Sequence, residues 1–236
     1  MAAQVSKPVD IEKIVKTLMG DEWMVKCGIG GVLAAAALVA ILYSFLCLPI
    51  FVACEALMIG YCLRCMRQKA ANPESKLPEW NEWGDLFASG ITWIALQTGI
   101  WLFFGSIQGL ILAFCCGFAF NEKSPDLSSV WTIAGCGVVS LAVAIMSALS
   151  SYTMVNFAIE ENKKAAFSFI KVARAFLKYP THLGGGFLLA TGIQWLSVII
   201  PCITLIGVFL VPSSFFVGQV LSSIILARHW QAWQES

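Results

Sequence analysis

Long apolar blocks alternate with short polar segments along the whole chain. The blocks cover residues 27-63, 88-120, 131-158 and 183-227, and they contain no charged residue other than Glu55. A helix needs about 20 apolar residues to cross a bilayer, so the first and last blocks are each long enough for two crossings. The pattern predicts an all-α polytopic transmembrane bundle over 27-227, with about six spans arranged as three helical hairpins.

Prolines mark the expected breaks inside the two longest blocks. Pro49 divides the first block near its middle, and Pro201 and Pro212 bracket the break in the last one. Proline removes a backbone donor and clashes with the preceding turn, so it ends or kinks a helix.

The two terminal segments, 1-26 and 228-236, are predicted to lie outside the bundle. Four apolar residues of the first segment recur at helical spacing, Ile11, Ile14, Val15 and Leu18. They indicate a short amphipathic helix on the membrane surface, and disorder of the first ten residues is the alternative. Neither an apolar stretch nor a small-residue cleavage site marks the first twenty residues as a secretory signal.

The distribution of basic residues predicts the orientation. With six spans, every Lys and Arg except Lys123 falls on one side of the membrane, together with both termini. Cytoplasmic loops are enriched in Lys and Arg, so this side is expected to be the cytoplasm. A five-span arrangement is the less favoured alternative, because it moves one basic loop to the opposite side.

Composition narrows the choice of partner. Hydrophobic residues make up 58% of the chain and charged residues 12%, against roughly 25% charged in soluble domains. The formal net charge is +1, whereas nucleic-acid binding needs a concentrated basic surface. The expected partner is therefore the lipid bilayer and not nucleic acid.

The acidic, Trp-rich segment 77-87 is predicted to be a cytoplasmic interfacial helix that leads into the next span. Its apolar residues recur every three or four positions, and its acids fall on the other face. Proline suits the first turn of a helix, and Trp rings suit the depth of the lipid headgroups. The motif residues are Pro78, Trp80, Trp83, Gly84, Asp85 and Phe87. They form a membrane anchor or, alternatively, a site for a ligand or a protein partner.

The segment 160-180 is predicted to be a second interfacial amphipathic helix. One face is apolar, with Ala166, Phe169, Ile170, Ala173, Phe176 and Leu177, and the other is basic, with Lys164, Lys171, Arg174 and Lys178. This pattern is typical of a helix that contacts the anionic headgroups of a bilayer.

Each returning span carries one polar residue inside its apolar run: Glu55, Asn156 and Gln219. Similar spacing to a basic helix end predicts that the three lie at similar depth and converge in the bundle interior. A charge at the bilayer centre costs about 3 kcal/mol on insertion scales, so Glu55 is expected to be protonated, paired or in contact with water. Glu55 is either a proton or cation relay of a transporter or a neutral residue that makes one hydrogen bond between helices.

Enzymatic and metal chemistry have little support in the sequence. The nine cysteines lack zinc spacing and do not form a disulfide framework, and His182 and His229 are the only histidines. The chain shows no Gly-rich phosphate loop and no nucleophile with a matching base. We therefore expect no metal, no cofactor and no catalytic activity.

Two runs of the sequence carry a family resemblance, GYCLRCMRQ at 60-68 and LPEWNEWGDLFASGI at 77-91. They resemble an uncharacterised prokaryotic integral membrane family, domain of unknown function 4013. Its members show a Gly-Tyr-x-x-Arg helix end followed by a Leu-Pro-x-Trp-x-x-Trp-Gly-Asp-Leu-Phe stretch. The resemblance extends loosely over 27-227 and implies a prokaryotic inner-membrane protein. The family has no established activity.

Two functions remain open at this stage. The preferred one is a non-catalytic membrane scaffold, assembly or lipid-organising component that acts through the two interfacial segments, with a protein partner or a second copy of the chain as further contacts. The alternative is a small proton-coupled transporter or flippase that uses Glu55.

Overall fold

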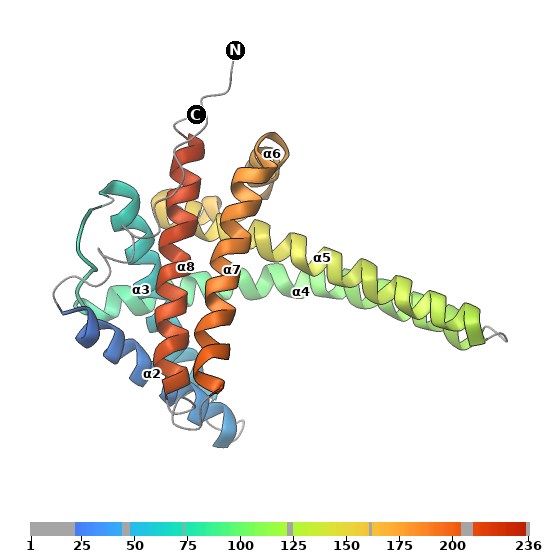
Figure 1. Cartoon of the computed structure of the whole chain (residues 1–236), viewed down its shortest axis with the longest axis horizontal. Helices are drawn as coiled ribbons and strands as arrows, with labels where there is room; N and C mark the ends of the chain where they lie inside the picture. The colour runs from blue at the N-terminus through green and yellow to red at the C-terminus, as the bar shows by residue number, and fades with distance from the viewer. Residues whose placement is uncertain are drawn as a thin grey trace, which may run out of the picture. The chain divides into compact units, whose positions relative to one another are not determined.

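The computed structural model describes residues 22–43, 48–72, 74–121, 125–160, 162–203 and 210–234, and these residues form helices joined by short connections (Figure 1). The helices are α2 (Trp23–Tyr43), α3 (Leu48–Ala71), α4 (Trp83–Asn121), α5 (Pro125–Glu160), the 3-10 helix η2 (Lys163–Phe167), α6 (Phe169–Lys178), α7 (Pro180–Cys202) and α8 (Val211–Gln234). Among the described residues, 6 helices are long and apolar enough to cross a membrane, namely α2, α3, α4, α5, α7 and α8. The predicted helical bundle of about six spans is confirmed.

The spans reach beyond the predicted limits of the bundle at both ends of the chain. Helix α2 begins at Trp23 and α8 continues to Gln234, so the predicted boundaries at 27 and 227 fall inside helices. The amphipathic helix predicted before residue 20 lies outside the described residues. Pro49 sits in the first turn of α3, where its missing N–H costs no helical hydrogen bond.

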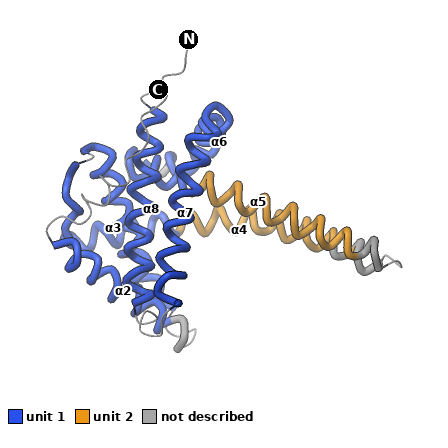
Figure 2. Tube along the Cα trace, viewed as in Figure 1, with its two compact units in different colours: residues 1–94, 151–236 blue, residues 95–150 orange. Residues whose placement is uncertain are grey.

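The chain divides into two compact units (Figure 2). Unit 1 comprises residues 1–94 and 151–236, and unit 2 comprises 95–150. In unit 1, α2, α3, α7 and α8 pack against one another, and α6 packs on α7. Small residues allow this close packing. A Cβ atom on Gly30 of α2 would overlap the ring of Phe216 on α8.

Helix α3 and the first turns of α4 meet through a reciprocal pair of glycines within unit 1. A Cβ atom on Gly60 would overlap the backbone carbonyl of Leu86, and one on Gly90 would overlap that of Ala56. Such contact with a carbonyl oxygen leaves no room for any side chain. The two glycines therefore bring the backbones of α3 and α4 together.

Unit 2 consists of the remaining parts of α4 and α5, which form a helical hairpin. The Gln97 amide donates a hydrogen bond to the Ser150 hydroxyl, and Gly135 packs on the side chain of Cys115. Large apolar side chains cover its outside, including Phe103, Leu110 and Ile133. A continuous apolar exterior is expected of helices that face lipid.

Candidate functional site

Residues 77–82 of the Trp-rich motif form an extended connection that we call the clasp, because side chains from two helices hold its backbone. The Lys26 ammonium from α2 donates to the Leu77 carbonyl at 3.0 Å. The Tyr61 hydroxyl from α3 donates to the Pro78 carbonyl, also at 3.0 Å. A third donor from α3, Arg64, reaches the Asn81 carbonyl at 3.2 Å. The clasp thus joins α2, α3 and the start of α4.

Side chains of the clasp also contact α2 and α3. The Trp80 indole N–H donates to the Lys26 carbonyl at 2.8 Å, and the Trp80 ring stacks on the Tyr61 ring with centroids 4.2 Å apart. The rings of Trp83 and Phe216 also lie close to the Trp80 ring, with centroid distances of 5.4 and 5.8 Å from it. The motif's central aromatic residue is therefore packed within unit 1.

The helix predicted for residues 77-87 is wrong over its first six residues, since α4 begins only at Trp83. Leu77 precedes a proline, which disfavours the helical conformation, and the clasp carbonyls accept hydrogen bonds from distant side chains. Glu82 adopts a left-handed conformation with a φ of 53°, and its carbonyl accepts the first hydrogen bonds of α4. The single apolar helix face predicted from Leu77 to Phe87 therefore does not form.

The remaining motif residues lie in the first turns of α4. Gly84 and Asp85 are exposed, and Trp83 and Phe87 are partly exposed on the surface of unit 1. Asp85 occupies the first turn, where a carboxylate interacts favourably with the helix N-terminus. Its carboxylate forms no hydrogen bond or ion pair with any described residue, and it lines a polar cavity of about 420 Å³ together with Arg64.

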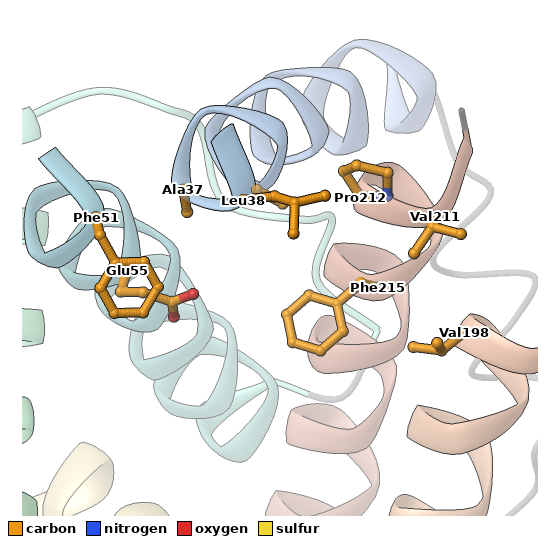
Figure 3. Close-up of a pocket in the computed structure, with 9 residues that line it drawn as sticks. Ala37, Leu38, Phe51, Glu55, Val198, Val211, Pro212 and Phe215 are labelled. Carbon is orange, nitrogen blue, oxygen red and sulfur yellow. The ribbon is translucent and has the colours of Figure 1, made fainter. Parts of the chain in front are cut away.

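Glu55 lines a different cavity of about 320 Å³, formed by α2, α3, α7 and α8 in unit 1 (Figure 3). The other lining residues are apolar, among them Leu38, Phe51, Val198 and Phe215. The Glu55 side chain extends from α3 toward the side on which Phe215 lies. Its carboxylate makes no hydrogen bond or ion pair with the residues that the structure describes. Glu55 is thus placed as a single polar group in an apolar cavity.

The three polar residues predicted to converge have separate surroundings. Asn156 is buried, donates to the Ser168 hydroxyl at 3.0 Å and accepts from the Lys171 ammonium at 3.1 Å. The buried side-chain oxygen of Gln219 has no hydrogen-bond partner among the described residues. Neither residue lines the Glu55 cavity. Helix α5 ends at Glu160, which places Asn156 one turn from the helix end. The convergence of the three side chains stays a prediction.

The segment 160-180 is helical in two pieces, η2 and α6, which meet at Ser168. Val172 and Ala175 of α6 are buried, whereas Ile170 and Leu177 are 69% and 84% exposed. The two buried residues lie outside the predicted apolar face of the segment, whereas the two exposed residues belong to it.

The basic residues of this segment differ in their contacts. The Lys171 ammonium donates to Asn156 and pairs with the Glu160 carboxylate at 2.7 Å, so its charge is neutralised within unit 1. Lys164 and Arg174 are exposed, and neither side chain bonds or pairs with a described residue. The Lys178 ammonium is also exposed and lies 5.1 Å from the centre of the Tyr179 ring. Arg174 and Lys178 are thus available to an outside anion.

Over the described ranges, no three His, Cys, Asp or Glu side chains come together as a metal site. His182 and His229 do lie close, with ring centroids 4.7 Å apart.

The sequence interpretation gave no site role to Lys26, Phe51 and Phe215, and it named Tyr61 only as part of the family motif. A signal existed for Phe51, which precedes Glu55 by four residues and so shares its helix face. Lys26 offered a weaker signal as a cation directly before an apolar block. Phe215 had none, because only the packing of α8 brings it to the cavity.

The fold and the exposed apolar exterior define an integral membrane protein built from a helical bundle. A family model described as "Protein of unknown function (DUF4013)" matches residues 41–225, which is more than half of the chain. The chain belongs to this family, as the resemblance implied. Comparisons with curated proteins and with solved structures give no match.

Proposed function

We propose that the protein is a non-catalytic, lipid-organising component of the prokaryotic inner membrane, and that α6 is the element that contacts anionic headgroups. The observation that carries the proposal is the arrangement of α6. Its exposed apolar residues, Ile170 and Leu177, lie beside the exposed cations Arg174 and Lys178. Such a helix inserts apolar side chains below the headgroups while its cations pair with phosphates.

Two features of the chain support this assignment. With six spans, the distribution of Lys and Arg favours a cytoplasmic location for both termini and for α6. The cytoplasmic leaflet carries the anionic lipids that attract basic residues, at about 1 kcal/mol for each residue near the surface.

The test measures anionic lipid that copurifies with the full chain, by quantitative lipid mass spectrometry. The double variant Arg174→Gln/Lys178→Gln is expected to lose about 2 kcal/mol of interaction and hence most of the bound phosphatidylglycerol. Lys76→Gln removes an exposed cation outside α6 and serves as the control. Equal retention by the double variant and the control would contradict the proposal. Retention of another protein chain instead of lipid would favour a scaffold role.

A second candidate function is proton-coupled transport that uses Glu55. The cavity beside Glu55 favours it, because a carboxylate without a described partner is available to a proton or a cation. The test is proton flux in proteoliposomes, followed with an entrapped pH dye. Flux that Glu55→Gln abolishes supports transport, and identical traces for both proteins exclude it.

A further inference from the structure

The cavity beside Glu55 combines features that define a class of ligand. Four helices contribute to its wall, and Glu55 supplies the only charged group among the lining residues that the structure describes. Its volume of about 320 Å³ falls in the range of small-molecule sites, which begins near 300 Å³. A ligand of this size would be surrounded largely by aliphatic and aromatic side chains.

Two phenylalanines define the region around the carboxylate (Figure 3). Phe51 lies four residues before Glu55 on α3 and therefore on the same helix face. Phe215 enters from α8, on the side toward which the Glu55 side chain extends. The face of a benzene ring attracts a cation, and this attraction strengthens where water is excluded.

The charge of the cavity excludes most other ligands. An anion would be repelled by the carboxylate and would meet no cation in the described wall. A sugar or other polyol would lose its hydrogen bonds to water and gain only one polar partner. A purely apolar molecule would leave the carboxylate without a partner.

We infer that this cavity binds a hydrophobic organic cation, an ammonium group with apolar substituents. The Glu55 carboxylate pairs with the positive charge, and Phe51 and Phe215 present ring faces to the methyl or methylene groups around it. The aliphatic wall, including Leu38 and Val198, receives the apolar substituents. The ligand thereby supplies the countercharge that no described residue provides.

The first test uses the full chain in nanodiscs of phosphatidylcholine and radiolabelled benzyltrimethylammonium as the probe. This cation keeps its charge at every pH and donates no N–H hydrogen bond, so its binding depends on its charge and its apolar groups. Equilibrium dialysis is expected to show saturable binding that weakens about tenfold or more in Glu55→Gln. In Phe215→Leu the affinity is expected to fall about threefold, through loss of one ring. Asp85→Asn, which removes an exposed carboxylate elsewhere, is expected to bind like the wild type.

A second readout needs no Glu55 variant. Dicyclohexylcarbodiimide reacts with carboxyl groups in apolar surroundings, and mass spectrometry quantifies the adduct at Glu55. Benzyltrimethylammonium is expected to protect Glu55, whereas neopentylbenzene, its uncharged carbon isostere, is expected to protect much less. Equal protection by both compounds, or unchanged dialysis in Glu55→Gln, would overturn the inference, because the carboxylate would then contribute nothing to binding.

These outcomes are separable from the proposed functions. The α6 experiments use different residues and a different ligand, so failure of one leaves the other intact. The inference uses the same Glu55 cavity as the proposed transport function. If the cation binds but no proton flux is measured, the binding site stands and proton-coupled transport is excluded.

Discussion

The Nζ atom of Lys26 lies 2.5 Å from the Oε1 atom of Glu79 and also donates to the Leu77 carbonyl. The two partners differ in their surroundings, because the Lys26 side chain is 6% exposed and that of Glu79 is 60% exposed. The ion pair therefore joins a buried cation of α2 to the outer edge of the clasp.

This asymmetry predicts unequal effects of removing each partner. Lys26→Met leaves the buried Leu77 carbonyl without its donor and is expected to reduce the free energy of unfolding by about 1 to 3 kcal/mol. Glu79→Gln weakens a partly exposed ion pair and is expected to cost less than about 1 kcal/mol. Thermal unfolding in one detergent measures both. A larger loss for Glu79→Gln than for Lys26→Met would show that the clasp is not held through Lys26.

The paired glycines give a steric prediction. Gly90→Ala forces the new methyl group onto the Ala56 carbonyl, so we expect a loss of about 2 kcal/mol or more through overpacking. Gly84→Ala is the matched control in the same helix, because no described atom beyond its chain neighbours and the backbone of its own helix lies within 4 Å of its Cβ position. This control is expected to be neutral or to stabilise by up to about 1 kcal/mol through helix propensity. Similar melting temperatures for the two variants would rule out the close backbone contact.

The basic residues of α6 should separate into two groups by their effects. Lys171→Gln removes the partner of Glu160 and a donor to Asn156, so it is expected to lower stability with little change in bound lipid. Lys178→Gln is expected to lower bound anionic lipid with little change in stability, since its ammonium lies over the Tyr179 ring and makes no hydrogen bond or ion pair with a described residue. Unfolding and lipid quantification on the same preparations test both. The reverse pattern would contradict the assigned roles.

Asn156 and Gln219 should respond in opposite directions to apolar substitution. Asn156→Leu removes a partner from both Ser168 and Lys171, and we expect a loss of about 1 to 3 kcal/mol. Gln219→Met replaces a buried oxygen that has no described partner, so the expected change is neutral or stabilising. The melting temperatures of the two variants measure the difference, and a destabilised Gln219→Met protein would reveal an important partner of that side chain.

The sequence predicted the spans well because membrane crossing depends on local properties. A run of apolar residues of sufficient length is enough to specify each helix, and Pro49 marks the start of α3. The amphipathic character of α6 was likewise visible in its local spacing.

The clasp was not predictable from local pattern. Residues Leu77 to Glu82 have helical apolar spacing, but their conformation depends on Lys26, which is 51 residues away, and on Tyr61. Side-chain donors from other helices satisfy carbonyls that a helix would otherwise use. A single sequence does not show which distant donors meet a segment.

The candidate sites were predicted only in part. Glu55 was found because a carboxylate in an apolar block is conspicuous, yet its aromatic neighbour Phe215 comes from another helix. The convergence of Glu55 with Asn156 and Gln219 stays a prediction, because the described contacts of Asn156 lie in the segment 160–171 and do not test it.

Hydrogen exchange of residues 163–178 in nanodiscs tests the lipid-organising role most directly. If α6 inserts between anionic headgroups, its amides should exchange about fivefold more slowly in phosphatidylglycerol than in phosphatidylcholine, and Arg174→Gln/Lys178→Gln should remove the difference. The hairpin of residues 95–150 provides an internal reference that should exchange equally in both lipids. Identical exchange of α6 in the two lipids, with or without its cations, would contradict the account.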